Sequence, residues 1–220
     1  MEKSRVIELA CKIDGWMDTN EMEWLYDQAA AVPAGGVWVE VGCWKGRSFL
    51  PTAMGINGDA TLWAVDTFEG DARCPAHWDG REVPNWVYDH FRITIDAIRR
   101  LRGVAAPVMK ILRCSSMQAS FGFQTKSVNG VFIDASHFYD SVSADIKAWM
   151  PLIKPGGIIS GHDFSYPDVE RAVKELVPNW EQGPKTIWWA RQRHKKRSGT
   201  FSTSDHRAAH STGIRSMRVN

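Results

Sequence analysis

The sequence predicts an α/β domain with a doubly wound, mostly parallel, seven-stranded, Rossmann-like sheet and helices on both faces. Five short runs of strand-forming residues alternate with helical patterns, and such alternation is typical of parallel strands joined by crossover helices. Two further short strands follow the last helical pattern, with Gly183-Pro184 between them. They predict a hairpin, so the sheet is expected to end in an antiparallel strand.

The predicted strands are short apolar runs bounded by turn residues, a pattern typical of strands buried on both faces. They cover residues 37–41, 62–66, 108–112, 128–134 and 157–161, with the hairpin around residues 179–181 and 186–190. Helices are predicted over residues 48–54, 87–101, 115–122, 141–153 and 167–177. Two more are expected before the first strand: one up to about residue 13, and one after Asp18, which has capping-box spacing with Glu21.

Length and composition predict one domain over residues 1–191 and a basic tail over residues 192–220. From residue 193 onward the tail has seven basic residues against Asp205 alone, whereas the whole chain has a formal net charge of only +2. The polar composition of the tail favours disorder. A tail of this charge can also bind nucleic acid, although nucleic acid is not the partner that we expect.

Several features predict a cytoplasmic protein that does not bind a membrane. No apolar run reaches the roughly 18 residues that a membrane-spanning helix needs, and the first residues lack the apolar stretch of a signal peptide. The four cysteines are scattered without a C-x-x-C pair, which predicts neither a zinc site nor a disulfide framework. The oligomeric state stays open, a homo-oligomer included.

A glycine-rich turn follows the first predicted strand, in the segment EVGCWKGRS. Gly42 and Gly46 allow the backbone to turn sharply and to approach a ligand closely. Their spacing differs from the G-x-G-x-x-G pattern that binds a pyrophosphate. Asp66 ends the second strand, 24 residues after Gly42, where an acidic side chain can accept hydrogen bonds from ribose hydroxyls. Together they predict a nucleoside-containing cofactor at the switch point of the sheet.

Four segments over about residues 14–190 resemble class I S-adenosylmethionine-dependent methyltransferases, in the small-molecule and sugar O-methyltransferase branch. These segments are VEVGCWKGRSF, AVDTFEGD, VFIDASHFYDSVSADIKAWMPLIKPGGIISGHDF, and PDVERAVKE with TIWW. The resemblance implies S-adenosylmethionine as the cofactor. It places Glu40, Gly42 and Gly46 around the methionine part, Asp66 at the ribose, Ser115 and Ser116 beside the adenine, and Asp134 beside the methyl donor.

Carboxylates and an imidazole follow two neighbouring strands of the predicted sheet. Asp134 ends the fourth strand and His162-Asp163 follows the fifth, so all three side chains are expected at one edge. This donor set suits a divalent cation such as Mg²⁺ or Mn²⁺. Related metal-dependent O-methyltransferases bind an ion at these strand ends, but they carry an acid or amide beside the second aspartate, where this chain has His162 and Phe164.

A second mechanism needs no metal. His137 follows Asp134 by three residues and can accept the proton of a hydroxyl group as a general base, with Asp134 or Asp140 to orient it. In the metal-dependent mechanism the ion lowers the pKa of the acceptor hydroxyl. Asp134, His137 and Asp163 are the candidate catalytic residues in either case.

The segment 67–107 is longer than a plain crossover needs, and its first part is rich in acids and aromatic residues. Loops at this position contact substrate in such folds. Trp78 and Trp86 are expected to stack on a sugar or ring face, and Asp71, His77 and Asp79 to hydrogen-bond its hydroxyls.

The predicted function is therefore methyl transfer to a hydroxyl of a small molecule, a sugar or glycoside first. Two alternatives keep the fold. A nucleic-acid methyltransferase would use the basic tail, but the chain has neither an Asp/Asn-Pro-Pro-aromatic motif nor a suitably placed Pro-Cys pair. An inactive cofactor-binding domain would leave buried acids and histidines without a purpose, at a cost in stability.

Overall fold

A computed structural model describes residues 1–70 and 83–193 of the chain. The predicted disorder of the basic tail from residue 194 onward lies outside the described residues. The same holds for four of the predicted acceptor contacts, Asp71, His77, Trp78 and Asp79.

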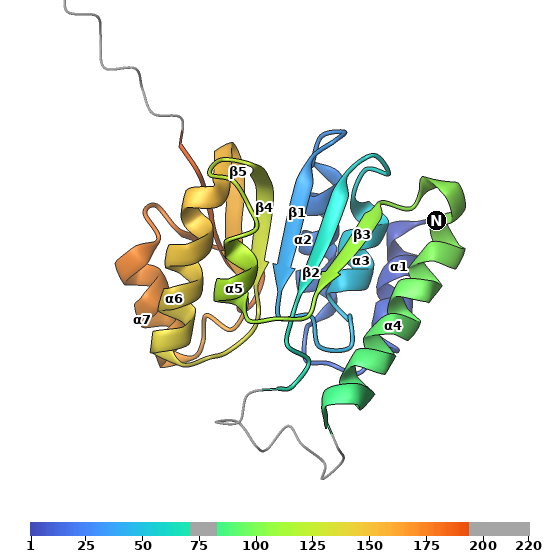
Figure 1. The fold of residues 1–220 in the computed structure, drawn as a ribbon, viewed down its shortest axis with the longest axis horizontal. Helices are drawn as coiled ribbons and strands as arrows, with labels where there is room; N and C mark the ends of the chain where they lie inside the picture. Colours follow the sequence, from blue (N-terminus) through green and yellow to red (C-terminus); the bar gives the residue numbers. More distant parts are fainter. Residues whose placement is uncertain (71–82, 194–220) are drawn as a thin grey trace, which may run out of the picture.

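The core of the fold is a seven-stranded sheet of order β3-β2-β1-β4-β5-β7-β6 (Figure 1). The first five strands are parallel: β1 (Val37–Val41), β2 (Thr61–Val65), β3 (Val108–Leu112), β4 (Val128–Ile133) and β5 (Ile153–Gly161). A hairpin of β6 (Glu181–Gln182) and β7 (Trp188–Arg191) follows, and β7 pairs antiparallel with β5. The predicted sheet, including its antiparallel end, is confirmed.

Helices cover both faces of the sheet (Figure 1). One face carries α1 (Lys3–Ala10), α2 (Thr19–Ala30), α3 (Phe49–Gly55) and α4 (Val83–Arg102), and the other carries α5 (Ser116–Ser120), α6 (Tyr139–Trp149) and α7 (Pro167–Leu176). Alternate residues of a strand point to opposite faces. Trp38 of β1 accordingly packs in the core under α1–α4, whereas its neighbour Val39 packs in the core under α5–α7. Within the described residues, no helix is long and apolar enough to cross a membrane.

Three boundaries differ from the predicted ones by four residues. Helix α6 ends at Trp149 and a short 3₁₀ turn follows (Met150–Leu152), because Pro151 has no backbone N–H with which to continue an α-helix. Strand β5 then begins at Ile153, which pairs with Val128, rather than at residue 157. Helix α4 begins at Val83, so Trp86 belongs to a helix and not to the predicted acceptor loop.

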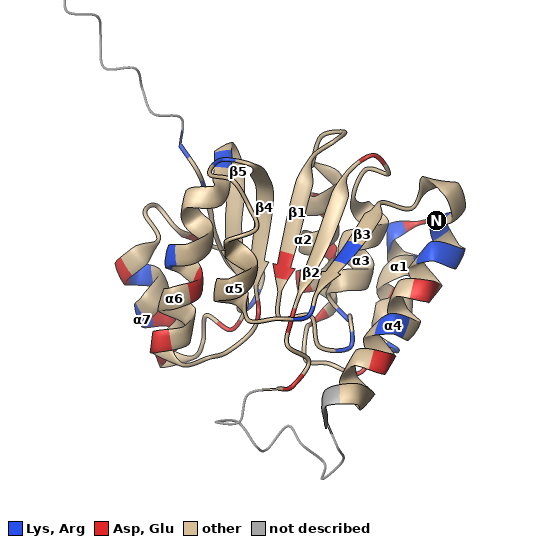
Figure 2. Ribbon diagram, viewed as in Figure 1, with Lys and Arg blue, Asp and Glu red and all other residues tan. Residues whose placement is uncertain are grey.

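The strand order creates the position for a site. β1 lies between β2 and β4. The chain adds β2 and β3 on one side of β1, then crosses over and adds β4 and β5 on the other side. Ligands of open α/β sheets bind outside the carboxyl ends of the strands at such a switch point. Figure 2 shows acidic residues at this end of the central strands.

Candidate active site

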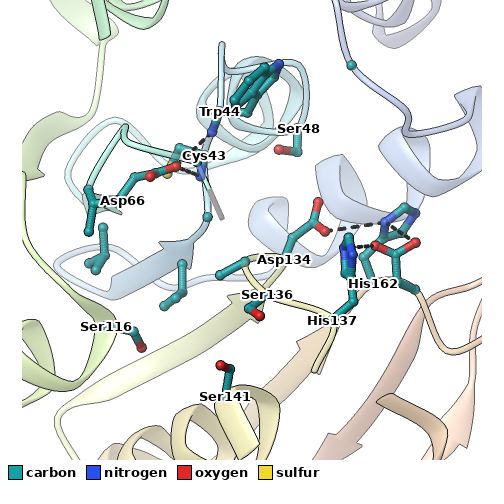
Figure 3. A pocket seen from close by; sticks show the side chains of 18 of the residues that line it. Cys43, Trp44, Ser48, Asp66, Ser116, Asp134, Ser136, His137, Ser141 and His162 are labelled. Carbon is teal, nitrogen blue, oxygen red and sulfur yellow. Dashed lines mark hydrogen bonds and ion pairs between the residues drawn. The ribbon is translucent and has the colours of Figure 1, made fainter. Parts of the chain in front are cut away.

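A cavity of about 600 Å³ lies at the carboxyl edge of the parallel strands (Figure 3). Most of the predicted site residues line it: Gly42, Asp66, Ser115, Ser116, Asp134, His137, His162 and Asp163. Glu40 and Gly46 are not among the lining residues. Residues from five strand ends thus meet at one cavity, as the parallel topology requires.

Gly42 allows the ends of β1 and β4 to come close together. Its φ angle is +84°, and a Cβ atom added there would overlap the carbonyl group of Asp134. The N–H of Asp134 donates to the carbonyl oxygen of Val41 at 2.7 Å, so the two strands stay paired up to the cavity. Gly46 meets a different neighbour, because an added Cβ atom would lie 2.9 Å from Cγ2 of Thr94 on α4. Gly46 therefore serves packing of the turn against α4.

Asp66 organises the turn after β1. Its Oδ2 accepts hydrogen bonds from the N–H groups of Cys43 at 2.7 Å and Trp44 at 2.9 Å, and its Oδ1 accepts one from the N–H of Phe68 at 2.7 Å. Burial raises the pKa of Asp66, while these backbone donors lower it. The carboxylate thus lines the cavity and also fixes the backbone beside it (Figure 3).

Glu40 lies one layer behind the cavity. Its side chain is fully buried, and its Oε1 accepts a hydrogen bond from Oγ of the cavity-lining Ser48 at 2.7 Å. Its Oε2 is buried without a hydrogen-bond partner among the described residues. Burial raises the pKa of Glu40 to about 8, because a charge there would have little solvation.

The two serines after β3 lie at the start of α5. Ser115 caps the helix, since its Oγ accepts a hydrogen bond from the N–H of Gln118 at 3.3 Å. The Oγ of Ser116 accepts one from Nε1 of Trp149 at 2.8 Å and also interacts with buried Asp145. Burial raises the pKa of Asp145 to about 6.

His162 is the centre of a cluster of carboxylates. Its Nδ1 lies 3.4 Å from Oδ1 of Asp134 and 3.3 Å from Oδ1 of Asp163, and its Nε2 lies 3.2 Å from Oε1 of Glu21. Burial alone would lower the pKa of the imidazole, but the three carboxylates together raise it well above its ordinary value. One atom each from Asp134, His162 and Asp163 lie within 4.8 Å of one another, close enough to hold one metal ion.

His137 contacts the second oxygen of Asp163. Its Nε2 lies 2.7 Å from Oδ2 of Asp163, and its ring stacks on Tyr166 with 4.7 Å between ring centroids. The orienting carboxylate is thus Asp163 rather than the expected Asp134 or Asp140. The hydrogen bond to Asp163 raises the pKa of His137, and the two histidines in turn hold the pKa of Asp163 below its ordinary value against the effect of burial.

The residues before β1 contribute more to the site than the sequence indicated. Gly15, Trp16 and Met17, between α1 and α2, line the cavity. The side chain of Glu21 contacts His162, whereas the capping-box spacing predicted for it only a contact at the start of a helix. Trp86, by contrast, is not among the cavity-lining residues: its ring packs 3.7 Å from Nζ of Lys45.

Comparison with known proteins identifies the family. A family model described as "Methyltransferase domain" matches residues 39–164, which hold the glycine turn, Asp66 and the whole of the Asp134–Asp163 cluster. The chain belongs to this methyltransferase family. This membership confirms the resemblance to class I S-adenosylmethionine-dependent methyltransferases that its motifs indicated.

Solved structures show the same fold at low sequence identity. A protein from Corynebacterium glutamicum has a TM-score of 0.60 at 13% identity, covering 89% of this chain and 91% of that one. The calicheamicin methyltransferase CalS11 has a TM-score of 0.58 at 17% identity, covering 86% and 90%. An S-adenosylmethionine-dependent O-methyltransferase from Thermotoga maritima has a TM-score of 0.57 at 11% identity, covering 87% and 72%.

A sequence relative is much longer than this methyltransferase. The uncharacterized protein y4gI of Sinorhizobium fredii is 28% identical over 128 residues, which are 57% of this chain and 13% of that protein. The methyltransferase chain thus spans only a small part of this relative's length.

Proposed function

We propose that the protein transfers the methyl group of S-adenosylmethionine to a hydroxyl group of a small molecule, with a sugar or glycoside as the acceptor. The observation that carries this proposal is the cluster of Asp134, His137, His162 and Asp163 in the same cavity as the Gly42 turn and Asp66. A hydroxyl is a weak nucleophile until it loses its proton, and this cluster offers groups that can take or stabilise that proton.

The cofactor is expected to bind along the strand ends from β3 to β1. Asp66 accepts the ribose hydroxyls, Ser115 and Ser116 lie beside the adenine, and Gly42 leaves room for the methionine part, with Glu40 and Gly46 supporting the turn from behind. The positively charged sulfonium then faces Asp134. The acidic character of the cavity, with Asp66, Asp134 and Asp163 among its lining residues, favours a cationic ligand.

His137 is the candidate general base. In the transfer step the acceptor oxygen forms a bond to the methyl carbon, the bond from that carbon to sulfur breaks, and the hydroxyl proton passes to His137. Asp163 holds Nε2 of His137 at 2.7 Å and stabilises the imidazolium that this proton creates. The products are the methyl ether and neutral S-adenosylhomocysteine.

The same cluster also fits a divalent cation. Its donors would be Nδ1 of His162 and Oδ1 of both Asp134 and Asp163, and Nδ1 lies 3.3–3.4 Å from these two oxygens. A bound Mg²⁺ or Mn²⁺ would lower the pKa of the acceptor hydroxyl. Without a metal, a protonated His162 can supply positive charge between the two aspartates instead.

Two proteins with the same fold suggest the acceptors to test first. CalS11 is described as a TDP-rhamnose 3'-O-methyltransferase, and the Thermotoga maritima protein as an O-methyltransferase. Their sequence identities to this chain are low, so these activities serve only to choose the first compounds for the assay. Trp16 and Tyr166, both partly exposed and both lining the cavity, offer aromatic faces for a sugar ring.

Formation of S-adenosylhomocysteine with a panel of sugar nucleotides, including TDP-rhamnose, and simple glycosides tests the proposal. Methylation of an acceptor hydroxyl supports it. Asp134→Ala should abolish turnover while the dissociation constant for S-adenosylhomocysteine stays within about three-fold, because only the chemical step needs this carboxylate. Normal turnover by Asp134→Ala would disprove the assignment of the site. Assays in excess chelator, with Mg²⁺ or Mn²⁺ added back, separate the metal-dependent mechanism from the metal-free one.

A further inference from the structure

We propose that Glu21 is a positioning residue for the methyl transfer: it holds the imidazole of His162 so that Nδ1 faces Asp134 and Asp163. This inference rests on the proposed function of the cluster. It makes the second helix of the chain, which precedes the matched methyltransferase domain, part of the catalytic site.

The two ring nitrogens of His162 face different carboxylates. Oε1 of Glu21 lies 3.2 Å from Nε2, and the two aspartate oxygens lie on the Nδ1 side at 3.3–3.4 Å. An ionised carboxylate accepts hydrogen bonds only, so Nε2 must carry a proton to bond with Glu21. This fixes the ring, and it leaves Nδ1 directed at the two aspartates in either mechanism. A carboxylate behind a functional histidine commonly sets the ring orientation in this way.

Glu21 is itself held in place by contacts on both oxygens. Its Oε2 accepts a hydrogen bond from the N–H of Asp18 at 2.9 Å, and its Oε1 accepts bonds from the N–H and Oγ1 of Thr186 at 3.0 and 2.8 Å. The side chain is only 2% exposed. A side chain held by α2 and by the loop before β7 has little freedom to move, so it can serve as a fixed reference for His162.

A burial cost argues that this contact is more than a helix cap. A capping residue can stay at the surface, where its charge is solvated, whereas Glu21 buries its carboxylate beneath the cavity. At that position Glu21 forms the ion pair with Nε2 of His162. The buried acid is compensated by His162 and Thr186, which lower its pKa although burial raises it.

Proton NMR of the full-length protein, saturated with S-adenosylhomocysteine, tests the contact without any acceptor. A proton on Nε2 that is buried and bonded to a carboxylate should give a downfield, slowly exchanging signal, assigned by its loss in His162→Gln. We expect the signal in wild type and in Glu23→Leu, which removes an exposed carboxylate from the same helix, and its loss or at least ten-fold faster exchange in Glu21→Leu. An unchanged signal in Glu21→Leu, or none in wild type, would overturn the inference. If Glu21→Leu does not fold, Glu21→Gln replaces it, and the signal must then move upfield because its acceptor is neutral.

Kinetics with the acceptor found in the panel separate positioning from stability. Glu21→Leu should lower kcat about 10- to 100-fold, the range typical of such supporting carboxylates, with the affinity for S-adenosylhomocysteine unchanged within two-fold. Glu23→Leu, at an exposed position of the same helix, should keep kcat within two-fold of wild type. Equal losses in the two variants would mean that Glu21 acts through the charge or the stability of α2 and not through its contact with His162. If wild type methylates nothing, the proposed function fails, whereas the NMR result still decides the contact.

Discussion

Nε2 of His137 lies 2.7 Å from Oδ2 of Asp163, whose other oxygen lies 3.3 Å from Nδ1 of His162. One carboxylate therefore connects two imidazoles that come from different strand ends. The contact raises the pKa of His137 above its ordinary 6.5. His137 and His162 thus belong to one charge network, in which the charge on either ring affects the pKa of the other.

The first prediction concerns the pH dependence of methyl transfer. If His137 is the base, kcat of the wild type falls as the pH drops through the raised pKa of His137, because a protonated imidazole cannot accept the hydroxyl proton. His137→Gln should lower kcat about 10²- to 10⁴-fold and remove this acid limb. A pH–rate profile in saturating cofactor measures both effects.

The matched control for that prediction is His90→Gln. His90 is exposed on α4, and its Nδ1 contacts the carbonyl group of Trp86 at 2.8 Å, away from the cavity. Its substitution should leave the profile unchanged. An acid limb that survives in His137→Gln would show that another group accepts the proton.

The second prediction concerns Asp66. Asp66→Ala removes the acceptor for three backbone N–H groups as well as the proposed contact to the ribose, so the variant should lose both stability and cofactor affinity. We expect a loss of at least about 3 kcal/mol in unfolding free energy, since each of the three unsatisfied buried donors costs about 1–3 kcal/mol. S-adenosylhomocysteine should bind at least ten-fold more weakly by calorimetry. Asp59→Ala, at an exposed turn, is the control, and equal affinities in wild type and Asp66→Ala would remove Asp66 from the cofactor site.

The residues at the strand ends were predictable from the sequence. Asp134 and Asp163 follow neighbouring apolar runs, and parallel strands present their carboxyl ends at one edge, so their proximity follows from pattern and topology alone. The same reasoning could place Gly42 beside them. The position of Glu40 needed a different argument. Side chains alternate between the two faces along β1, so Glu40 lies on the same face as Trp38, behind the cavity.

The contacts that orient the histidines were not predictable. Glu21 and His162 are far apart in the sequence, and the capping-box pattern explained Glu21 completely without a tertiary partner. The expected partner of His137 was Asp134 or Asp140, both close to it along the chain, but the carboxylate that contacts its ring is Asp163, at the adjacent strand end. Local spacing identifies residues that can interact within one helix or strand. The contacts of His137 and His162 join different elements, so they depend on how these elements pack.

The third prediction separates backbone strain from close packing at Gly42. Gly42→Ala places a methyl group both in a left-handed conformation and against the carbonyl group of Asp134, whereas Gly35→Ala has a similar φ of +68° with no atom within 4 Å of the added carbon. Left-handed backbone costs a non-glycine residue about 1–2 kcal/mol. Gly35→Ala should lose that amount, and Gly42→Ala about 1–3 kcal/mol more from overpacking. Urea denaturation measures the difference, and equal losses would show that β4 moves aside freely.

The last prediction concerns the buried acid beneath Ser116. Asp145 is only 7% exposed, and burial raises its pKa from 3.8 to about 6, so the folded state holds its proton more tightly than the unfolded state. Ionised Asp145 therefore destabilises the fold: its effect is absent below pH 3.8, grows as the pH rises to 6, and is complete above that. A shift of this size corresponds to about 3 kcal/mol.

The unfolding free energy of Asp145→Asn in urea should accordingly match that of the wild type near pH 4 and exceed it by up to that amount near pH 7.5. Asp89→Asn, on the exposed side of α4, should show no such divergence. Parallel stability curves for wild type and Asp145→Asn would mean that Ser116 and its neighbours solvate the charge fully, and that the acid lies in a more polar environment than its burial suggests.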